Sequence, residues 1–278
     1  MDYKTKKLVL NIIKYGVLLF FILVCLLPIS WIWFSALKTK MEIFTNPFGM
    51  PSSLNFSNII KAWTAGRFGK YFLNSVIIAV PTVLLVIASS SLAGFALGKL
   101  KFKGREWFFA LFLLGLTLPF QALMIPLYYT LKDLNLLANY LGVIFPMTAY
   151  GLPFGVFFMR AFFKELPDEL LEAARIDGCS NIKLFFVILL PLAKPAVISL
   201  FIFQFIASWN NFLMPLLFLQ KEALRPLTLG LMFFSGAYTM DYGLVFAGIT
   251  IITFPLIVIY VIFQRQFITG LTSGAVKS

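Results

Sequence analysis

The residues of this chain that could do chemistry are few, and most lie within long apolar stretches. The sequence contains no His and only two Cys, which excludes an imidazole general base, a His-ligated metal and a thiolate-rich metal cluster. One polar cluster stands out, formed by Trp209, Asn210 and Asn211. An aromatic face beside two amides can stack on a sugar ring and hydrogen-bond its hydroxyls. We therefore predict no catalytic residue and no metal site, and we treat this cluster as a candidate binding element.

Other polar side chains share this apolar setting. An unpaired amide in hydrocarbon costs on the order of several kcal/mol, so each one must face a neighbouring helix or a wet cavity. Bonding between helices is favoured for any single residue, whereas packing and solute contact are about evenly balanced for the cluster around Trp209. The candidates for a solute pathway are Gln121, Gln204, Trp209, Asn210 and Asn211.

The composition indicates that membrane helices position these residues. Of the 278 residues, 60% are apolar, 17% are aromatic and only 12% are charged. A soluble globule has about a quarter charged residues, so this chain could not cover a water-facing surface. The net charge of +12 is distributed in short clusters between uncharged runs, which argues against nucleic acid as a partner. We predict an all-α integral membrane protein.

Six stretches of about 20 residues are predicted to cross the membrane. They are 15–37, 74–98, 107–130, 140–163, 195–218 and 243–264, and the fourth is free of charge up to residue 159. The first stretch follows four Lys but is about 23 residues long and lacks a clean cleavage site, so we expect an anchor rather than a signal peptide. Together they define a six-span transmembrane domain over 15–264.

The segments between the spans alternate in their content of Lys and Arg. One set has 15 in 71 residues and comprises 1–14, 99–106, 160–194 and 265–278. The other has eight in 69 residues and comprises 38–73, 131–139 and 219–242. Because basic loops are retained in the cytoplasm, we expect a cytoplasmic N-terminus at 1–14 and a cytoplasmic tail at 265–278.

Energy coupling within the chain itself is disfavoured. No span carries an ionisable group at membrane depth, which argues against a proton-coupled carrier, while sodium coupling stays open as an alternative. The string from Gly94 to Lys99 has three residues between its glycines and is followed by Leu100, so it does not match a phosphate-binding loop. If transport is uphill, another polypeptide must bind the nucleotide.

Small residues recur at intervals of four in two spans. Ser90, Gly94 and Gly98 do so in the second span, and Gly151 and Gly155 in the fourth. This spacing is typical of surfaces where two membrane helices approach closely, so we predict interhelical contacts at these positions.

The segment 164–194 is the longest one expected inside, and it is predicted to form two short helices. Pro167 suits a first helical position and Gly178 suits a left-handed cap, which gives a helix of about 11 residues and about 16 Å. Ser180 can cap the second helix, which should end near Pro191. The first helix carries Leu170, Ala173, Ala174 and Asp177 on one face.

Because two Ala leave this face shallow, we expect another protein to dock on it. An amphipathic loop lying on lipid headgroups is the alternative.

This segment also resembles a known signature. Glu172-Ala173-Ala174-x-x-Asp177-Gly178, followed by Phe185, Ile188, Leu190-Pro191 and Pro195, resembles the EAA motif of binding-protein-dependent ABC importer permeases. Cys179 stands where Ala is common in that motif, a change between small residues. Further stretches are similar to the carbohydrate-uptake subfamily, in particular to the second permease subunit of the maltose transporter, and they are 120–122, 125–128, 208–210, 225–228 and 270–277.

The resemblance implies a type I ABC importer permease in a prokaryotic cytoplasmic membrane. Its partners would be a second homologous permease, a cytosolic ATPase dimer and an extracytoplasmic sugar-binding protein. ATP and Mg would be bound by the ATPase subunits, with no cofactor in this chain. By the same analogy, the cytoplasmic coupling helix would use Glu172, Ala173, Ala174, Asp177 and Gly178, and the tail would contact the ATPase through Gly270, Leu271, Thr272, Gly274 and Lys277.

The resemblance favours a sugar, in particular an oligosaccharide, as the transported solute. An ABC permease for another solute such as glycerol phosphate is the first alternative. A secondary carrier or a membrane-bound scaffold is the second.

Overall fold

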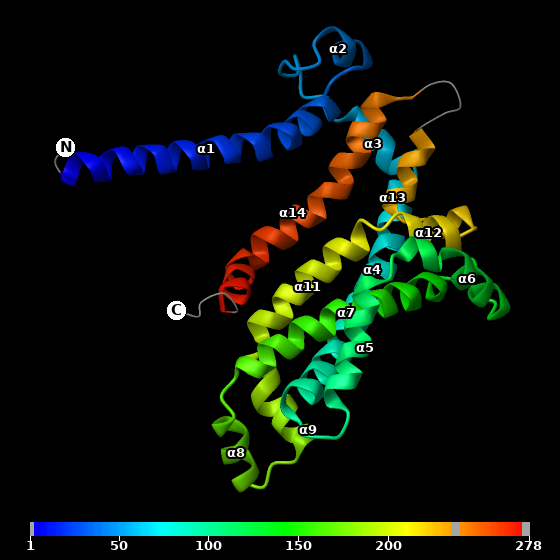
Figure 1. The fold of residues 1–278 in the computed structure, drawn as a ribbon. Coiled ribbons are helices and arrows are strands. Elements are labelled where there is room, and N and C mark those ends of the chain that lie inside the picture. Colours follow the sequence, from blue (N-terminus) through cyan, green and yellow to red (C-terminus); the bar gives the residue numbers. More distant parts are fainter. Residues whose placement is uncertain (1–2, 235–239, 274–278) are drawn as a thin grey trace. The chain divides into compact units, whose positions relative to one another are not determined.

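The computed structural model describes residues 3–234 and 240–273, and every regular element within these ranges is helical (Figure 1). The all-α prediction is thus confirmed for this part of the chain. The α-helices are α1 (Tyr3–Ala36), α2 (Lys40–Thr45), α3 (Ser57–Thr64), α4 (Phe68–Lys99), α5 (Arg105–Thr117), α6 (Phe120–Asp133), α7 (Leu141–Glu165), α8 (Glu169–Ile176), α9 (Asn181–Leu184), α10 (Leu190–Leu192), α11 (Lys194–Trp209), α12 (Leu213–Phe218), α13 (Leu227–Gly230) and α14 (Tyr242–Ser273). A π-helical turn covers Phe185–Leu189, and 3-10 turns cover Glu222–Leu224 and Leu231–Phe234.

Four single helices in the described residues are long and apolar enough to cross a membrane. They lie at Thr5–Ala36, Phe68–Lys99, Leu141–Glu165 and Tyr242–Gln266. Two further candidates are bent pairs, Arg105–Thr117 with Phe120–Asp133 at 100° and Asn181–Leu192 with Lys194–Trp209 at 76°. The number of spans is therefore between four and six, depending on whether each bent pair counts as one.

The third predicted span, 107–130, is not one straight helix. Leu118, between α5 and α6, has extended dihedral angles, with φ −80° and ψ 114°. Proline disfavours the helical conformation in the residue that precedes it, and Pro119 follows Leu118. Pro119 also lacks the N–H that a continuous helix would need. The sequence places a proline here, but a proline alone does not determine whether a helix kinks or breaks.

The chain divides into two compact units, and each is described by itself. The first unit comprises Met1–Phe68 and Gly230–Thr253. In it, the side chain of Lys38 is fully buried, and its ammonium donates hydrogen bonds to the carbonyls of Asn46 at 2.8 Å and Pro47 at 3.1 Å. These bonds fix the turn that follows α2 against the end of α1.

The second unit comprises Gly69–Leu229 and Phe254–Ser278, and α4 and α7 pack closely within it. A Cβ atom added at Gly94 would lie 2.7 Å from the Met159 Cβ, and one added at Gly155 would lie 2.8 Å from the Ser90 Cβ. Only glycine permits this approach, so the predicted contacts between the small residues of the two helices are confirmed. They form a rigid pair on which the rest of the unit is built.

A polar network holds the loop after α12 against the first half of α4. The Asn74 amide donates to the carbonyls of Ala223 and Arg225, both at 2.9 Å, and its oxygen accepts from the Tyr140 hydroxyl at 2.7 Å. The Ser75 hydroxyl accepts from the Leu227 amide at 2.9 Å. The side chains of Asn74 and Ser75 are thus paired rather than left unsatisfied in hydrocarbon.

Candidate functional site

The segment with the EAA signature forms α8 and α9, which lie together at one end of the second unit (Figure 1). Helix α8 begins at Glu169, with Asp168 as its N-cap, and ends at Ile176. It has eight residues, so the expected length of about 11 residues was too long. The expected start at Pro167 was also wrong, because this residue precedes the cap.

The two faces of α8 differ in burial. Leu171 is 3% exposed and Ala174 is 4% exposed, and both pack into a core with Phe163 and Leu184. The expectation that both Ala side chains face a partner is therefore wrong for Ala174, which packs against its own chain. Ala173 is exposed. The buried face anchors α8 to the membrane helices, and the outer face stays open.

The residues on the open side of this segment are charged or apolar. Glu172, Arg175 and Asp177 are exposed, and Ile176 and Ile182 are 86% and 73% exposed. The outer side of this segment thus combines exposed charged groups with two exposed Ile side chains.

The turn after α8 has the predicted geometry. Gly178 has a φ of +74°, and its amide donates to the Arg175 carbonyl at 3.0 Å, while the Cys179 amide donates to the Ala174 carbonyl at 2.9 Å. This is a left-handed helix cap, a conformation that glycine adopts at little cost. The predicted cap of the next helix is also confirmed, because the Ser180 hydroxyl accepts from the Lys183 amide at 3.3 Å.

A lysine at the end of α4 holds the start of α8. The ammonium of Lys99 donates to the Asp168 carboxylate and to the Leu166 carbonyl, each at 2.5 Å. Its side chain is only 4% exposed, whereas that of Asp168 is 75% exposed. The Lys99 ammonium holds the pKa of the Asp168 carboxyl below its ordinary value of 3.8, chiefly by this hydrogen bond. Helix α8 is thereby fastened to α4 at its first turn.

A buried arginine joins three helices nearby. The Arg160 guanidinium on α7 donates to both oxygens of Glu106 on α5 at 2.6 Å, and its Nε donates to the Leu97 carbonyl on α4 at 3.0 Å. It also lies 3.7 Å from the centre of the Phe109 ring.

The role of Arg160 was not predicted from the sequence. In the sequence, Arg160 is only the first charged residue after a long uncharged run. Glu106, one residue before the third predicted span, was the available signal. Glu106 and Arg160 lie near the ends of two predicted spans on the same side of the membrane, so an ion pair between them could have been predicted.

The predicted solute-pathway residues lie on two helices and differ in their surroundings. Trp209 is 2% exposed, and its ring stacks on Phe205 with centroids 5.3 Å apart. The Gln204 amide donates to the Gly151 carbonyl at 3.3 Å, and the Asn211 oxygen accepts from the Met214 amide at 3.1 Å. These three side chains therefore take part in packing within the chain.

The remaining two candidates are accessible. Asn210, the C-cap of α11, and Gln121, in the first turn of α6, are exposed. Within the described residues, the Trp209 ring and the Asn211 oxygen already have partners in the chain, and solute contact by this cluster stays a prediction.

The tail residues lie at and beyond the end of α14. Helix α14 continues to Ser273, so Gly270, Leu271 and Thr272 belong to its last turns, whereas we expected the span to end near residue 264. Gly274 and Lys277 lie outside the described residues. Among the residues that the structure covers, no group of three His, Cys, Asp or Glu side chains could bind a metal ion.

Fold and site together define a multi-pass helical membrane protein with an exposed amphipathic helix pair at one end. The chain belongs to the family described as the inner membrane component of binding-protein-dependent transport systems, whose model matches residues 86–272. This family assignment confirms the resemblance seen in the sequence.

Individual relatives match over nearly the whole chain. The arabinooligosaccharides transport system permease protein AraQ of Halalkalibacterium halodurans is 38% identical over 93% of this chain and 93% of its own. The diacetylchitobiose uptake system permease protein NgcG of Streptomyces coelicolor is 34% identical over 95% of this chain and 88% of its own. The probable starch degradation products transport system permease protein AmyC of Thermoanaerobacterium thermosulfurigenes is 34% identical over 90% of this chain and 91% of its own.

The fold also matches a solved structure. A bacterial ABC transporter involved in the import of the acidic polysaccharide alginate superposes with a TM-score of 0.82 at 23% identity, covering 96% of this chain and 99% of that one. The ABC importer permease fold is therefore shown.

Proposed function

We propose that this chain is a transmembrane permease subunit of an ATP-driven sugar importer, with an oligosaccharide as the transported solute. The names of the relatives support the solute class, since they refer to diacetylchitobiose, arabinooligosaccharides and starch degradation products. Both termini lie in the cytoplasm of a prokaryotic cell. Six spans result when α5 with α6 counts as one span and the segment Asn181–Leu192 with α11 counts as another.

The proposed mechanism assigns α8 as a coupling helix. It docks in a cleft of a cytosolic ATPase subunit, and ATP-driven closure of the ATPase dimer moves it as a rigid lever. The observation that carries this proposal is that α8 is buried on one face, tied to α4 through Lys99 and Asp168, and open on the other face. A helix held in this way cannot move without moving the spans to which it is fastened.

The remaining partners follow from the family. A second homologous permease completes the pathway, a sugar-binding protein delivers the solute from outside, and the ATPase subunits bind ATP and Mg. The end of α14 and the residues after it contact the ATPase pair. Solute selectivity lies mainly with the binding protein, so the exposed Asn210 and Gln121 are the first residues to test for direct contact.

The docking proposal is tested in the assembled complex with an Ala173→Trp variant. Ala173 is exposed, so the indole leaves the chain's own packing intact but obstructs a docked partner. We expect sugar uptake and binding-protein-stimulated ATP hydrolysis to fall about tenfold, the effect of overpacking a fitted contact. Ala161→Trp, at an exposed site on α7, is the matched control and should retain both activities. Full coupling in the Ala173 variant would refute the role of α8.

The solute and the mode of energy coupling need separate tests. Binding of oligosaccharides and of glycerol phosphate to the cognate binding protein separates the two ABC importer alternatives. Gradient-driven uptake by the purified chain alone in liposomes would instead favour a secondary carrier.

A further inference from the structure

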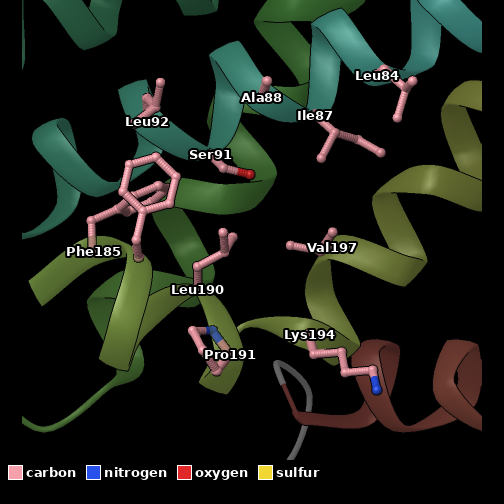
Figure 2. Close-up of a pocket in the computed structure, with 11 residues that line it drawn as sticks. Leu84, Ile87, Ala88, Ser91, Leu92, Phe185, Leu190, Pro191, Lys194 and Val197 are labelled. Carbon is pink, nitrogen blue, oxygen red and sulfur yellow. The ribbon is translucent and has the colours of Figure 1, made fainter. Parts of the chain in front are cut away.

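A groove with a volume of about 520 Å³ opens between α4 and the segment that leads into α11 (Figure 2). On one side it is lined by Leu84, Ile87 and Leu92, and on the other by Phe185, Leu190 and Val197. Its walls are almost entirely apolar, so a sugar has little to bind there. The groove is therefore separate from any solute pathway.

A single hydroxyl interrupts this apolar lining. Ser91 is 2% exposed, and its Oγ has no hydrogen-bond partner among the described residues. Its neighbour Ser90 donates to the Val86 carbonyl at 2.5 Å. A serine hydroxyl in a helix often bonds the carbonyl four residues earlier in this way. Figure 2 shows the Ser91 oxygen directed into the groove instead. Because an unpaired buried hydroxyl is costly, an occupant with an acceptor atom would be stabilised there.

A single charge lies at the mouth of the groove. Lys194, at the start of α11, lines the groove, and its side chain has no ion pair or hydrogen bond within the described part of the chain. It precedes Val197 by three residues, or about 4.5 Å along the axis. The groove thus combines an apolar trough, one buried donor and one terminal cation.

The groove is shorter than one leaflet of a bilayer. Leu84 and Leu92 lie about 22 Å and 10 Å along the α4 axis from Lys99, the last residue of the helix, so they are about 12 Å apart. Half of a bilayer's hydrocarbon core is about 15 Å thick. With the cytoplasmic orientation proposed above, on which this step rests, Leu92 marks the end of the groove nearer the inner-leaflet headgroups.

We infer that the groove is a binding site for an anionic phospholipid. One acyl chain fills the apolar trough, an ester carbonyl accepts from Ser91, and the phosphate pairs with Lys194. An apolar helix of a partner permease would fill the trough but would supply neither the acceptor nor the negative charge. Free phosphate would satisfy Lys194 but would leave the trough empty.

The test uses the assembled transporter in vesicles that contain either phosphatidylglycerol or phosphatidylcholine with a photoactivatable acyl chain. After irradiation, labelled peptides are mapped by mass spectrometry. We expect phosphatidylglycerol to label the peptides over 84–92 and 185–197 about fivefold more than phosphatidylcholine, the gain from one lysine near an anionic surface. Excess glycerol phosphate should not compete.

Three variants distinguish the contribution of the Lys194 charge to lipid binding from that of the apolar trough. Lys194→Gln should abolish the preference for phosphatidylglycerol, whereas the control Lys164→Gln, which removes a cation from an exposed site on α7, should not. Ala88→Trp fills the groove from an exposed position and should remove labelling by both lipids.

Equal labelling by the two lipids, an unchanged preference in Lys194→Gln, or crosslinking of position 88 to the partner permease would overturn the inference. Sugar uptake is not a readout, so failure of the lipid site and failure of the proposed transport function are distinguishable.

Discussion

The ammonium of Lys99 lies 2.5 Å from the carboxylate of Asp168, although the two residues are 69 positions apart. Lys99 ends a membrane helix, and Asp168 is the cap of the short helix α8. The contact therefore fastens the element that we assign to ATPase docking to a span inside the second unit. In the proposed mechanism, this contact is one route by which motion of α8 reaches α4.

Removal of the Lys99 cation should lower the coupling of ATP hydrolysis to sugar uptake more than it lowers assembly of the complex. In Lys99→Gln, Asp168 loses its ion pair, while Leu171 and Ala174 still hold α8 in the core. We expect sugar uptake per ATP hydrolysed to fall about three- to tenfold, since a charge-assisted contact is lost. Lys99→Arg should recover most of this ratio. The control Lys101→Gln, at an exposed lysine two residues on, should leave the ratio unchanged.

The contribution of the Lys99–Asp168 ion pair to stability should not change with pH in the physiological range. A carboxyl with a lowered pKa in the folded state contributes stability that is present above its unfolded pKa and is lost as the pH falls through the folded pKa. The Lys99 ammonium holds the pKa of the Asp168 carboxyl below 3.8.

The difference in Tm between the wild type and Asp168→Asn should therefore stay constant from neutral pH to about pH 5. It should shrink only in stronger acid, and a decline between pH 8 and 6 would contradict the assignment.

Close packing between α4 and α7 predicts a contrast between two glycines. A Cβ at Gly94 would lie 2.9 Å from the backbone nitrogen of Arg160, which cannot move aside cheaply, whereas nothing lies within 4 Å of a Cβ at Gly16. Gly94→Ala should lower the unfolding free energy by about 1–3 kcal/mol through overpacking. Gly16→Ala should be neutral or slightly stabilising because alanine favours helix. Thermal unfolding of the purified complex measures both.

How much the sequence reveals depends on whether the governing interaction is local. The spacing of Ser90, Gly94 and Gly155 was sufficient to predict helix contact, because small residues on one face have few other uses in a membrane helix. Gly178 and Ser180 were predictable for the same reason, since cap chemistry involves only a few neighbouring residues.

Side-chain contacts that depend on three-dimensional packing were not predictable in this way, even between residues that are close in the sequence. Lys38 was counted as a loop charge, yet it is fully buried and bound to two carbonyls. The stacking of Trp209 on Phe205 was missed because a periodic pattern shows that an aromatic residue faces inward but not whether its own helix covers it. Likewise, Pro119 marks an interruption of the helix, but the sequence does not determine the 100° angle between α5 and α6.

The cap at Gly178 offers a test of α8 geometry without a change in contacts. Its φ is +74°, and nothing lies within 4 Å of a Cβ at this position, so the cost of Gly178→Ala is in the backbone alone. That cost is about 1–2 kcal/mol for an L-residue held in the left-handed region. We expect reduced binding-protein-stimulated ATP hydrolysis in Gly178→Ala and a smaller loss in Gly178→Asn, because Asn tolerates this conformation. Equal effects of the two substitutions would argue against strain as the cause.

Arg160 should be the least replaceable charged residue of the second unit. It is 6% exposed and joins α4, α5 and α7 through Leu97, Glu106 and the Phe109 ring. Arg160→Ala leaves the Leu97 carbonyl without this donor and should lower the unfolding free energy by about 1–3 kcal/mol. Arg160→Lys should recover only part of the loss, since an ammonium cannot reproduce the planar fork of hydrogen bonds.

Glu106→Gln separates the charge from the geometry, because its amide oxygen can still accept from the guanidinium. If bridging of three helices is the main role, its Tm should lie between those of the wild type and Arg160→Ala. A Tm for Glu106→Gln as low as that of Arg160→Ala would show instead that the ion pair dominates.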